Sequence, residues 1–240
     1  MLSRGSPQAR IGLIIPSSNR LTEPQFQHYA CPGVSVHVTR LRMTGKWHRP
    51  LTELREAVAS AAGLLSDVKP GVIVFHCTAS SMEAGLAGEE AVVKLVQSAA
   101  GCPALTTGQA ITEALSRLRV RKLVLVSPYV KETSQSEIRY LQEAGFEVIH
   151  NVALGLSGSD EYIAVKPEQW KEIVYGNARN EAEGYLLSCT NTTTVEVIDE
   201  LEAFLKRPIV TSNQATLWAC LQKLGFTKPI VGLGCLFEQT

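Results

Sequence analysis

Two cysteines occupy matching places in two similar stretches of this 240-residue sequence. Cys77 and Cys189 each follow a short apolar run, and each precedes a threonine, Thr78 or Thr190. A thiolate is a strong nucleophile and a thiol can donate a proton. A pair of cysteines on either side of a small molecule could therefore attack it from one side and protonate it from the other. Such chemistry requires neither a metal nor an organic cofactor, and we predict no cofactor.

The stretches around the two cysteines belong to a longer internal repeat. Three segments of the first half recur in the same order, about 110 residues later, in the second half: 10–16 and 121–127, 71–78 and 184–190, 102–110 and 207–215. One such match could arise by chance between apolar segments, but an ordered set is poorly explained in that way. The sequence therefore indicates a duplicated half of about 110 residues.

Short apolar runs alternate with longer amphipathic stretches along the whole chain. The runs predict buried parallel strands at 11–15, 34–41, 72–75, 123–126, 147–152, 185–187 and 208–210. The stretches predict helices at 51–66, 81–100, 109–118, 130–144, 167–182, 194–205 and 214–224.

This alternation predicts an α/β fold of two similar parallel-sheet, Rossmann-like αβα domains. We expect a pseudo-twofold axis to relate the domains and the active site to lie in the cleft between them. The first domain should span residues 8–118, joined by the C-terminal segment 214–240, and the second domain should span residues 119–213.

Ligands of open parallel sheets bind beyond the carboxyl ends of the strands. In this sequence the residues at those ends are small, hydroxylic or amide-bearing, and our candidates for binding a substrate are Ser17, Asn19, Thr78, Tyr129 and Thr190. With nearby backbone N–H groups, they would hold a carboxylate and the enediolate that develops from it. We also expect a helix to follow each cysteine, so that its N-terminus stabilises a thiolate.

The other four cysteines have no repeated partner, and we expect them to act as small hydrophobic residues. They are Cys31, Cys102, Cys220 and Cys235. His76 precedes Cys77, so the alternation of a strand should turn its side chain away from the cleft. This favours a packing or supporting role for the histidine.

The composition excludes several classes of function. The 23 basic residues balance 23 acidic ones, which leaves no basic field for a nucleic acid. The apolar runs are far shorter than the ~20 residues of a membrane span. The N-terminus lacks the apolar segment of a secretory signal, so we expect a cytoplasmic protein. Pro-Ser-Ser-Asn follows the first strand in place of a glycine-rich phosphate loop, which disfavours NAD and ATP.

The chain resembles the aspartate/glutamate racemase superfamily, most nearly its maleate cis–trans isomerase branch and more distantly arylmalonate decarboxylase. The resemblance covers about residues 10–234 and is based on the segments 16–19, 76–80, 127–129, 188–191 and 210–215. It implies that Cys77 is the nucleophile that adds to a double bond and that Cys189 is its acid/base partner. It also implies that Asn19 and Tyr129 hold the substrate carboxylates. The decarboxylase branch typically keeps only the second cysteine, so Cys77 argues against that activity.

One position departs from the isomerases of this family. They carry a further carboxylate-binding asparagine in the loop after a second-half strand, where this chain has Asp160. An ionised aspartate facing a substrate would repel a dicarboxylate and attract an ammonium or amide group. Alternatively, Asp160 caps a turn. The identity of the carboxylate substrate stays open at this point.

These observations predict a cofactor-independent isomerase of a small carboxylate, of the maleate isomerase type, which we expect to form a homo-oligomer (a dimer or tetramer). One alternative is a racemase of an amino acid or its derivative, in which both thiols exchange an α-proton. A second is a non-catalytic, two-lobed protein that binds a small molecule. A third is a redox sensor in which Cys77 and Cys189 form a disulfide.

Overall fold

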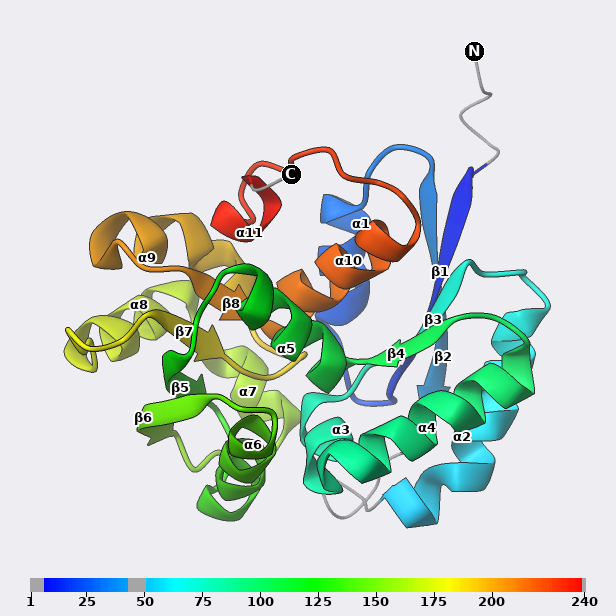
Figure 1. Ribbon diagram of the computed structural model, residues 1–240, viewed down its shortest axis with the longest axis horizontal. Helices are drawn as coiled ribbons and strands as arrows, with labels where there is room; N and C mark the ends of the chain where they lie inside the picture. The colour runs from blue at the N-terminus through cyan, green and yellow to red at the C-terminus, as the bar shows by residue number, and fades with distance from the viewer. Residues whose placement is uncertain (1–6, 43–50, 239–240) are drawn as a thin grey trace.

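Two four-stranded parallel sheets organise the computed structural model, which describes residues 7–42 and 51–238 (Figure 1). The first sheet, in the order β2-β1-β3-β4, contains β1 (Ala9–Pro16), β2 (Val34–Leu41), β3 (Val72–Phe75) and β4 (Ala104–Thr106). The second, in the order β6-β5-β7-β8, contains β5 (Lys122–Ser127), β6 (Glu147–Ala153), β7 (Gly184–Leu187) and β8 (Ile209–Thr211). The two sheets have the same order, which confirms the predicted fold of two similar α/β halves.

Helices flank both sheets. The first half contains α1 (Thr22–Tyr29), α2 (Leu51–Ser66), α3 (Thr78–Glu83), α4 (Gly85–Ala100) and α5 (Thr107–Arg117). The second half contains α6 (Lys131–Glu143), α7 (Ser159–Ala164), α8 (Pro167–Gly176), the 3-10 helix η1 (Thr194–Val197) and α9 (Ile198–Leu205). The chain ends with α10 (Ser212–Lys223) and α11 (Cys235–Glu238). Four of these elements, α1, α7, α11 and β4, are short and were not predicted from the sequence.

The repeat in the sequence has a local physical basis at the turns that follow β4 and β8. Thr106 and Thr211 are the last residues of these strands, and each caps the helix that follows. In each case the side chain of the glutamine three residues later accepts a hydrogen bond from the backbone N–H of the threonine, which completes a capping box. The same turn therefore starts α5 in one half and α10 in the other.

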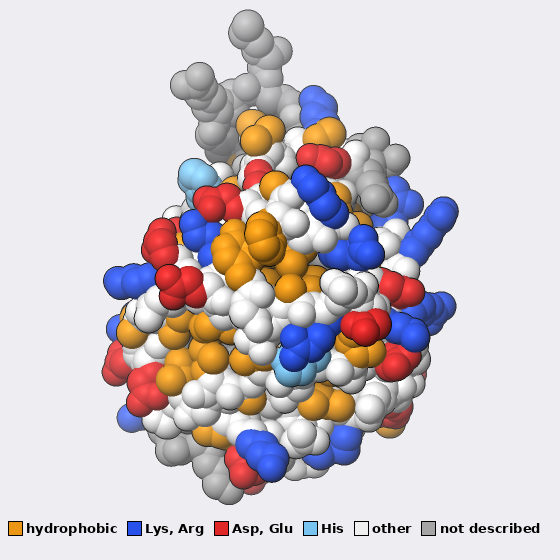
Figure 2. All heavy atoms as spheres, turned by 90° about the vertical axis from the view of Figure 1, so that its left-hand side faces the viewer, with side chains coloured by type: hydrophobic (Ala, Val, Ile, Leu, Met, Phe, Trp, Pro, Cys, Tyr) orange, Lys and Arg blue, Asp and Glu red, His pale blue; other side chains and the backbone are white. Residues whose placement is uncertain are grey.

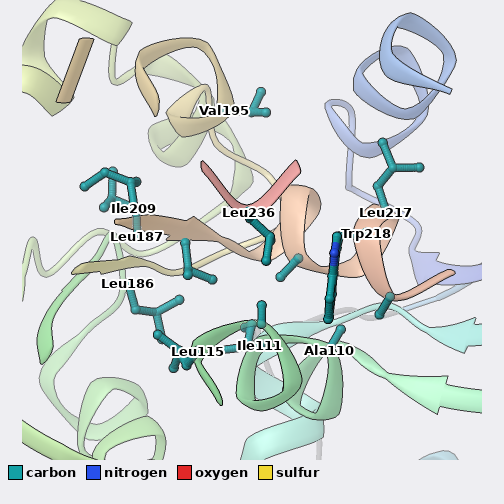
Figure 3. Close-up of a cluster of buried hydrophobic side chains, with 14 of the residues drawn as sticks. Ala110, Ile111, Leu115, Leu186, Leu187, Val195, Ile209, Leu217, Trp218 and Leu236 are labelled. Carbon is teal, nitrogen blue, oxygen red and sulfur yellow. The ribbon is translucent and has the colours of Figure 1, made fainter. Parts of the chain in front are cut away.

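Helices α5 and α10 pack against each other between the two sheets (Figure 3). Their buried apolar side chains join those of β7 and β8 in one core, including Ala110, Ile111, Leu115, Leu186, Ile209, Leu217 and Trp218. Helix α10 also contacts α1 of the first half. The N–H groups of Gly234 and Cys235 donate to Asp199 and Glu202 of α9. The C-terminal part of the chain therefore contacts both halves.

The surface of the second half mixes charges of both signs. Acidic and basic side chains are interspersed on this face, with patches of apolar side chains between them (Figure 2). This pattern agrees with the equal numbers of acidic and basic residues in the sequence. No helix within residues 7–42 and 51–238 is long and apolar enough to cross a membrane.

Candidate active site

A cavity of about 40 Å³ lies where the carboxyl ends of the two sheets meet. By the same measure a single water needs only ~10–15 Å³, so a small organic molecule fits. Residues of both halves form its wall: Pro16, Ser18, Asn19, Cys77, Ala79, Tyr129, Thr133, Ser159, Tyr162, Cys189, Thr190 and Asn191. No lysine, arginine, aspartate or glutamate is among these wall residues. No cluster of metal-binding side chains occurs in the described part of the chain.

The cavity brings together five of the eight residues predicted for the site. Those five are Cys77, Cys189, Asn19, Tyr129 and Thr190. Thr78 lies behind the wall, fully buried, and its hydroxyl donates to the Ser212 hydroxyl at 2.9 Å. Ser17 is exposed, and the neighbouring Ser18 lines the cavity in its place.

Asp160 was a candidate for binding the substrate, with the capping of a turn as the alternative, and the structure places its side chain away from the cavity. Its side chain is 93% exposed and forms an ion pair with Arg20 of the other half. The preceding residue, Ser159, lines the cavity and donates a hydrogen bond to Ser18 at 2.9 Å. The first turn of α7 thus turns the serine inward and the carboxylate outward.

Cys77 and Cys189 each lie two residues beyond equivalent strands, β3 and β7. Cys77 directly precedes α3, and its thiol donates to the Ser80 hydroxyl at 3.4 Å. The expectation of a helix after each cysteine is wrong for Cys189, because an irregular segment follows it and η1 begins only at Thr194.

The backbone at Cys189 is strained. Its φ of 109° lies in a region that residues with a side chain rarely adopt. Two hydrogen bonds hold this conformation. The Cys189 N–H donates to the Ser212 hydroxyl at 3.0 Å, and the Asn191 N–H donates to the Cys189 sulfur at 3.4 Å. The sulfur is therefore held at a fixed place in the wall.

Burial favours the protonated form of both thiols. Burial raises the pKa of Cys77, and burial raises the pKa of Cys189 to about 12 although the Tyr129 hydroxyl hydrogen-bonds its sulfur. The nearby Glu137 and Cys77 add to the rise for Cys189. Desolvation therefore acts against the thiolate that a helix N-terminus was expected to stabilise, and it outweighs the hydrogen bonds of the two thiols.

Two tyrosines form the apolar side of the cavity. The rings of Tyr129 and Tyr162 pack edge to face with their centroids 5.6 Å apart, and Ala79, Cys189 and Leu156 complete the cluster. Burial raises the pKa of both phenols above the ordinary value of 10. Both hydroxyls are therefore neutral and can donate hydrogen bonds.

The side chain of Asn19 is held at both ends by the protein. Its Oδ1 accepts from the N–H groups of Leu21 and Thr22 at the start of α1, at 3.1 and 3.0 Å. Its Nδ2 donates to the backbone oxygen and the hydroxyl of Thr190, both at 3.1 Å. Asn19 therefore links the two halves at the rim of the cavity.

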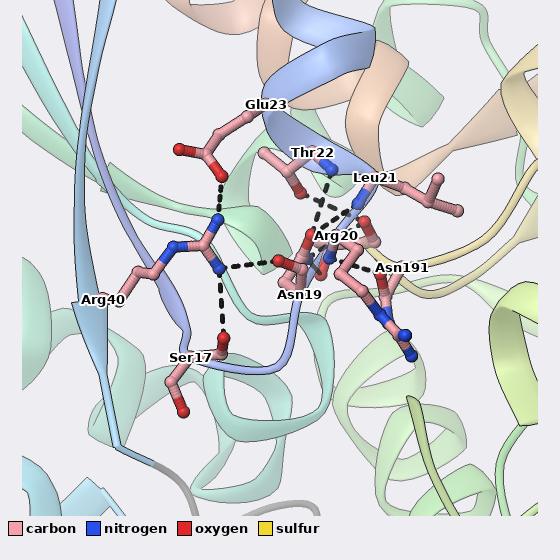
Figure 4. Close-up of polar contacts among 9 residues, drawn as sticks. Ser17, Asn19, Arg20, Leu21, Thr22, Glu23, Arg40 and Asn191 are labelled. Carbon is pink, nitrogen blue, oxygen red and sulfur yellow. Dashed lines mark hydrogen bonds and ion pairs between the residues drawn. The ribbon is translucent and has the colours of Figure 1, made fainter. Parts of the chain in front are cut away.

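Arg40 supports the loop that carries Asn19 (Figure 4). From β2 its guanidinium donates to the backbone oxygens of Ser17 and Asn19, at 3.1 and 2.7 Å, and pairs with Glu23. Two of these contacts are to the loop and the third is to α1, so the guanidinium is fixed between them. Arg40 does not line the cavity, and its contacts indicate that it positions the loop.

His76 lies behind the cysteine that follows it, as strand alternation predicts. It is fully buried between Asn213 and Thr107, with hydrogen bonds of 2.8 and 2.9 Å. Burial lowers its pKa to about 4, so the imidazole is neutral. These contacts fit the predicted supporting role.

Sequence reasoning missed several residues of the site. Ser159 and Tyr162 belong to the six-residue helix α7, which is too short to show an apolar period. Glu137 lies within a predicted helix, but no spacing marks it as buried. The structure buries it fully, with its carboxylate accepting from the Ser188 hydroxyl next to Cys189, and burial raises its pKa to about 8.

The chain is similar to two kinds of characterised enzyme. It is 28% identical to a maleate isomerase of Pseudomonas putida, over 95% of this chain and 97% of that one. It is 26% identical to an arylmalonate decarboxylase of Bordetella bronchiseptica, over 77% of this chain and 78% of that one.

Solved structures of the same two enzymes share the fold. A Nocardia farcinica maleate cis–trans isomerase, a cysteine-to-serine variant with a covalently bound succinylcysteine intermediate, gives a TM-score of 0.90 at 22% identity, covering 97% of this chain and 99% of that one. A glycine-to-cysteine variant of arylmalonate decarboxylase gives 0.86 at 24% identity, covering 96% and 100%. The family model described as arylmalonate decarboxylase matches residues 11–237. The chain therefore belongs to the arylmalonate decarboxylase family, and its relatives include the maleate isomerases that its motifs resemble.

Proposed function

We propose that this chain is a cofactor-independent cis–trans isomerase that converts maleate, or a similar unsaturated C4 dicarboxylate, to its trans isomer. The observation that carries the proposal is that Cys77 and Cys189, one from each half, line a single small cavity. Four maleate isomerases that are 23–28% identical along 94–96% of the chain support it. The bound succinylcysteine in the Nocardia enzyme is the product expected when a thiol adds to maleate.

Cys77 acts as the nucleophile in this proposal. Its thiol releases a proton to water as the substrate binds, and the sulfur then bonds to one alkene carbon. The π electrons move to the other carbon, where the adjacent carboxylate spreads them as an enediolate. Cys189 protonates this carbon, so a succinyl group is now attached to Cys77 through a single C–C bond.

Rotation about that single bond brings the two carboxylates to opposite sides. The thiolate of Cys189 then removes a proton from the carbon that it had protonated. The C–H electrons re-form the double bond, the C–S bond breaks, and Cys77 leaves as a thiolate, which takes a proton back from water when the product is released. Every bond made in the first stage is broken in the second, so the reaction consumes no oxidant, reductant or cofactor.

The outward position of Asp160 supports a dicarboxylate substrate. Because Asp160 pairs with Arg20 at the surface, no carboxylate among the wall residues would repel an anion. The same feature disfavours an amino-acid racemase, because no acidic wall residue is present to pair with an ammonium group. The hydroxyls of Ser18, Thr190 and Tyr129 are suited to hold carboxylate oxygens.

The name of the matching family model gives a second candidate, the decarboxylation of a malonate. After the loss of CO₂ this reaction would need one thiol, Cys189, to protonate the enediolate. Isomerisation needs both thiols, so the two functions differ in whether Cys77 is essential.

Turnover of maleate in deuterated water, followed by NMR, tests the proposal. We expect the wild-type protein to form fumarate, Cys77→Ala to be inactive and Cys189→Ala to keep at most a trace of activity. Cys220→Ala removes a buried thiol outside the cavity and should turn over normally. Wild-type rates in Cys77→Ala, or CO₂ release from an arylmalonate with no fumarate from maleate, would contradict the isomerase.

The remaining predictions from the sequence belong to the same proposal. We propose that the enzyme works in the cytoplasm as a dimer or tetramer. Ser17 and Thr78 were predicted to bind the substrate, but neither lines the cavity, and we propose instead that they support the binding loops. Light scattering of the purified protein tests the oligomeric state.

A further inference from the structure

One polar group at the cavity is buried and has no partner within the described protein. Asn191 is only 5% exposed, and its Nδ2 makes no hydrogen bond to the described residues. Its Oδ1 accepts from the backbone N–H of Arg20 at 2.9 Å (Figure 4). A backbone N–H can only donate, so this contact identifies the oxygen end of the amide. The free end is therefore the NH₂ group, a donor.

Buried donors are almost always satisfied in folded proteins, because leaving one without an acceptor is costly. Asn191 lines the cavity, and its Nδ2 is out of contact with bulk solvent. A molecule bound in the cavity that Asn191 lines would supply the acceptor that the described residues do not. The two hydrogens of Nδ2 suit a carboxylate oxygen, which is an acceptor only.

Asn19, the other asparagine of the wall, differs from Asn191 in this respect. The amide of Asn19 donates to Thr190 and accepts from the backbone of α1, so both of its ends are occupied. The amide of Asn191 is anchored at its oxygen and free at its nitrogen. Of the two asparagines, Asn191 has the side chain whose donor is still unused.

Asn191 is also tied to the second cysteine. Its backbone N–H donates to the Cys189 sulfur at 3.4 Å, two residues away along the chain. Both residues line the same small cavity, so a carboxylate held by the Asn191 amide would share that cavity with the thiol that exchanges the proton. This is the place where the enediolate develops in the proposed reaction.

We infer that Asn191 binds the substrate, its Nδ2 donating to the carboxylate that becomes the enediolate beside Cys189. The inference is based on the proposed function, since it assigns a carboxylate to that site. Arg20 contributes from outside the cavity: its side chain pairs with Asp160, and its backbone N–H orients the Asn191 amide.

The variant Asn191→Asp tests this assignment, because it keeps the shape and the oxygen that accepts from Arg20 but replaces the donor with a carboxylate oxygen. Asn180→Asp is the matched control, since it adds the same charge at an exposed site outside the cavity. The probes are maleate for turnover and succinate, an unreactive saturated C4 dicarboxylate, for binding by calorimetry. We expect Asn191→Asp to weaken succinate binding and raise the KM for maleate at least 100-fold at pH 7.5.

Two further measurements separate substrate binding from a structural role. The binding defect of Asn191→Asp should shrink at pH 5, because a protonated carboxyl can donate again, while its melting temperature stays close to that of Asn180→Asp. Asn191→Ser, with a shorter donor, should bind succinate with intermediate affinity. Succinate binding within twofold of wild type in Asn191→Asp would overturn the inference, as would a defect that is the same at both pH values.

The succinate measurement also keeps this inference distinct from the proposed function. A wild-type protein that binds succinate but does not convert maleate would contradict the isomerase and leave the Asn191 comparison valid. A wild-type protein that binds no dicarboxylate at all would contradict both.

Discussion

The buried carboxyl of Glu137 gives the structure a testable dependence on pH. Glu137 lies on α6 with no exposed surface, and its carboxyl contacts the Ser188 hydroxyl. Burial raises its pKa to about 8, whereas a glutamate in an unfolded chain titrates near ~4.3. The folded protein therefore keeps a proton on Glu137 at pH values where the unfolded chain has lost it.

The sign of the effect follows from the proton count. Between the unfolded and the folded pKa the native state binds more protons, so the free energy of unfolding decreases as the pH rises. The slope for one group is about 1.4 kcal/mol per pH unit. From pH 5 to pH 7.5 Glu137 should therefore lower the stability of the wild-type protein by about 3 kcal/mol, an order-of-magnitude figure.

The substitution Glu137→Gln removes this titration and keeps the size of the side chain. We expect the stability of the variant relative to wild type to rise by about 3 kcal/mol between pH 5 and pH 7.5. Urea unfolding of both proteins at half-unit pH steps measures the difference. The neutral His76 and the buried Glu89 are common to both proteins, so their contributions cancel in the comparison.

Glu132→Gln on the same helix is the control, because Glu132 is exposed. Its pH profile is the reference for removing one carboxyl from this helix. Parallel pH profiles for wild type and Glu137→Gln would refute the reasoning, since they would mean that the native state holds no extra proton at this site.

Three further substitutions test other parts of the site. Cys189→Gly should be more stable than Cys189→Ala by about 1 kcal/mol in thermal unfolding, because glycine adopts a φ of 109° without strain; an alanine variant of equal or higher stability would contradict this. Asp160→Asn should change the KM for maleate less than threefold and the stability by less than about 1 kcal/mol, as expected for the loss of an exposed ion pair. A large gain in affinity for maleate would show that Asp160 acts on the substrate. Arg40→Met removes the donors that hold the Ser17–Asn19 loop and should raise KM about tenfold in steady-state kinetics. Unchanged kinetics in this variant would mean that the loop holds its shape without the guanidinium.

The fold could be predicted from the sequence because the same pattern of apolar runs and turn residues occurs in both halves. The central strands β3 and β7 are buried along their whole length, so they occur as continuous apolar runs in both halves. The turns that begin α5 and α10 use the same threonine and glutamine residues. Short elements such as β4 and α7 give no such signal, since three to six residues do not establish a period.

The sequence predicted those residues of the site that closely follow a strand, because the ends of the strands fix their positions. Cys77 and Cys189 follow equivalent strands, and that placement alone brings them to one cavity. The direction of a side chain within a short helix is a tertiary property, which is why the sequence left open whether Asp160 faces the substrate, and the structure places it outward. The free amide of Asn191 depends on a backbone contact with Arg20, 171 residues earlier in the chain, that no local pattern encodes.

Two similar halves within one chain are free to differ in sequence, whereas two identical subunits must change together. The surroundings of the two cysteines illustrate this freedom, since a helix follows Cys77 directly but a left-handed backbone and an irregular segment mark Cys189. The two sulfurs of one cavity therefore have different surroundings, and a molecule bound there meets two different reagents. An enzyme built in this way can assign bond formation to one face of its substrate and proton exchange to the other.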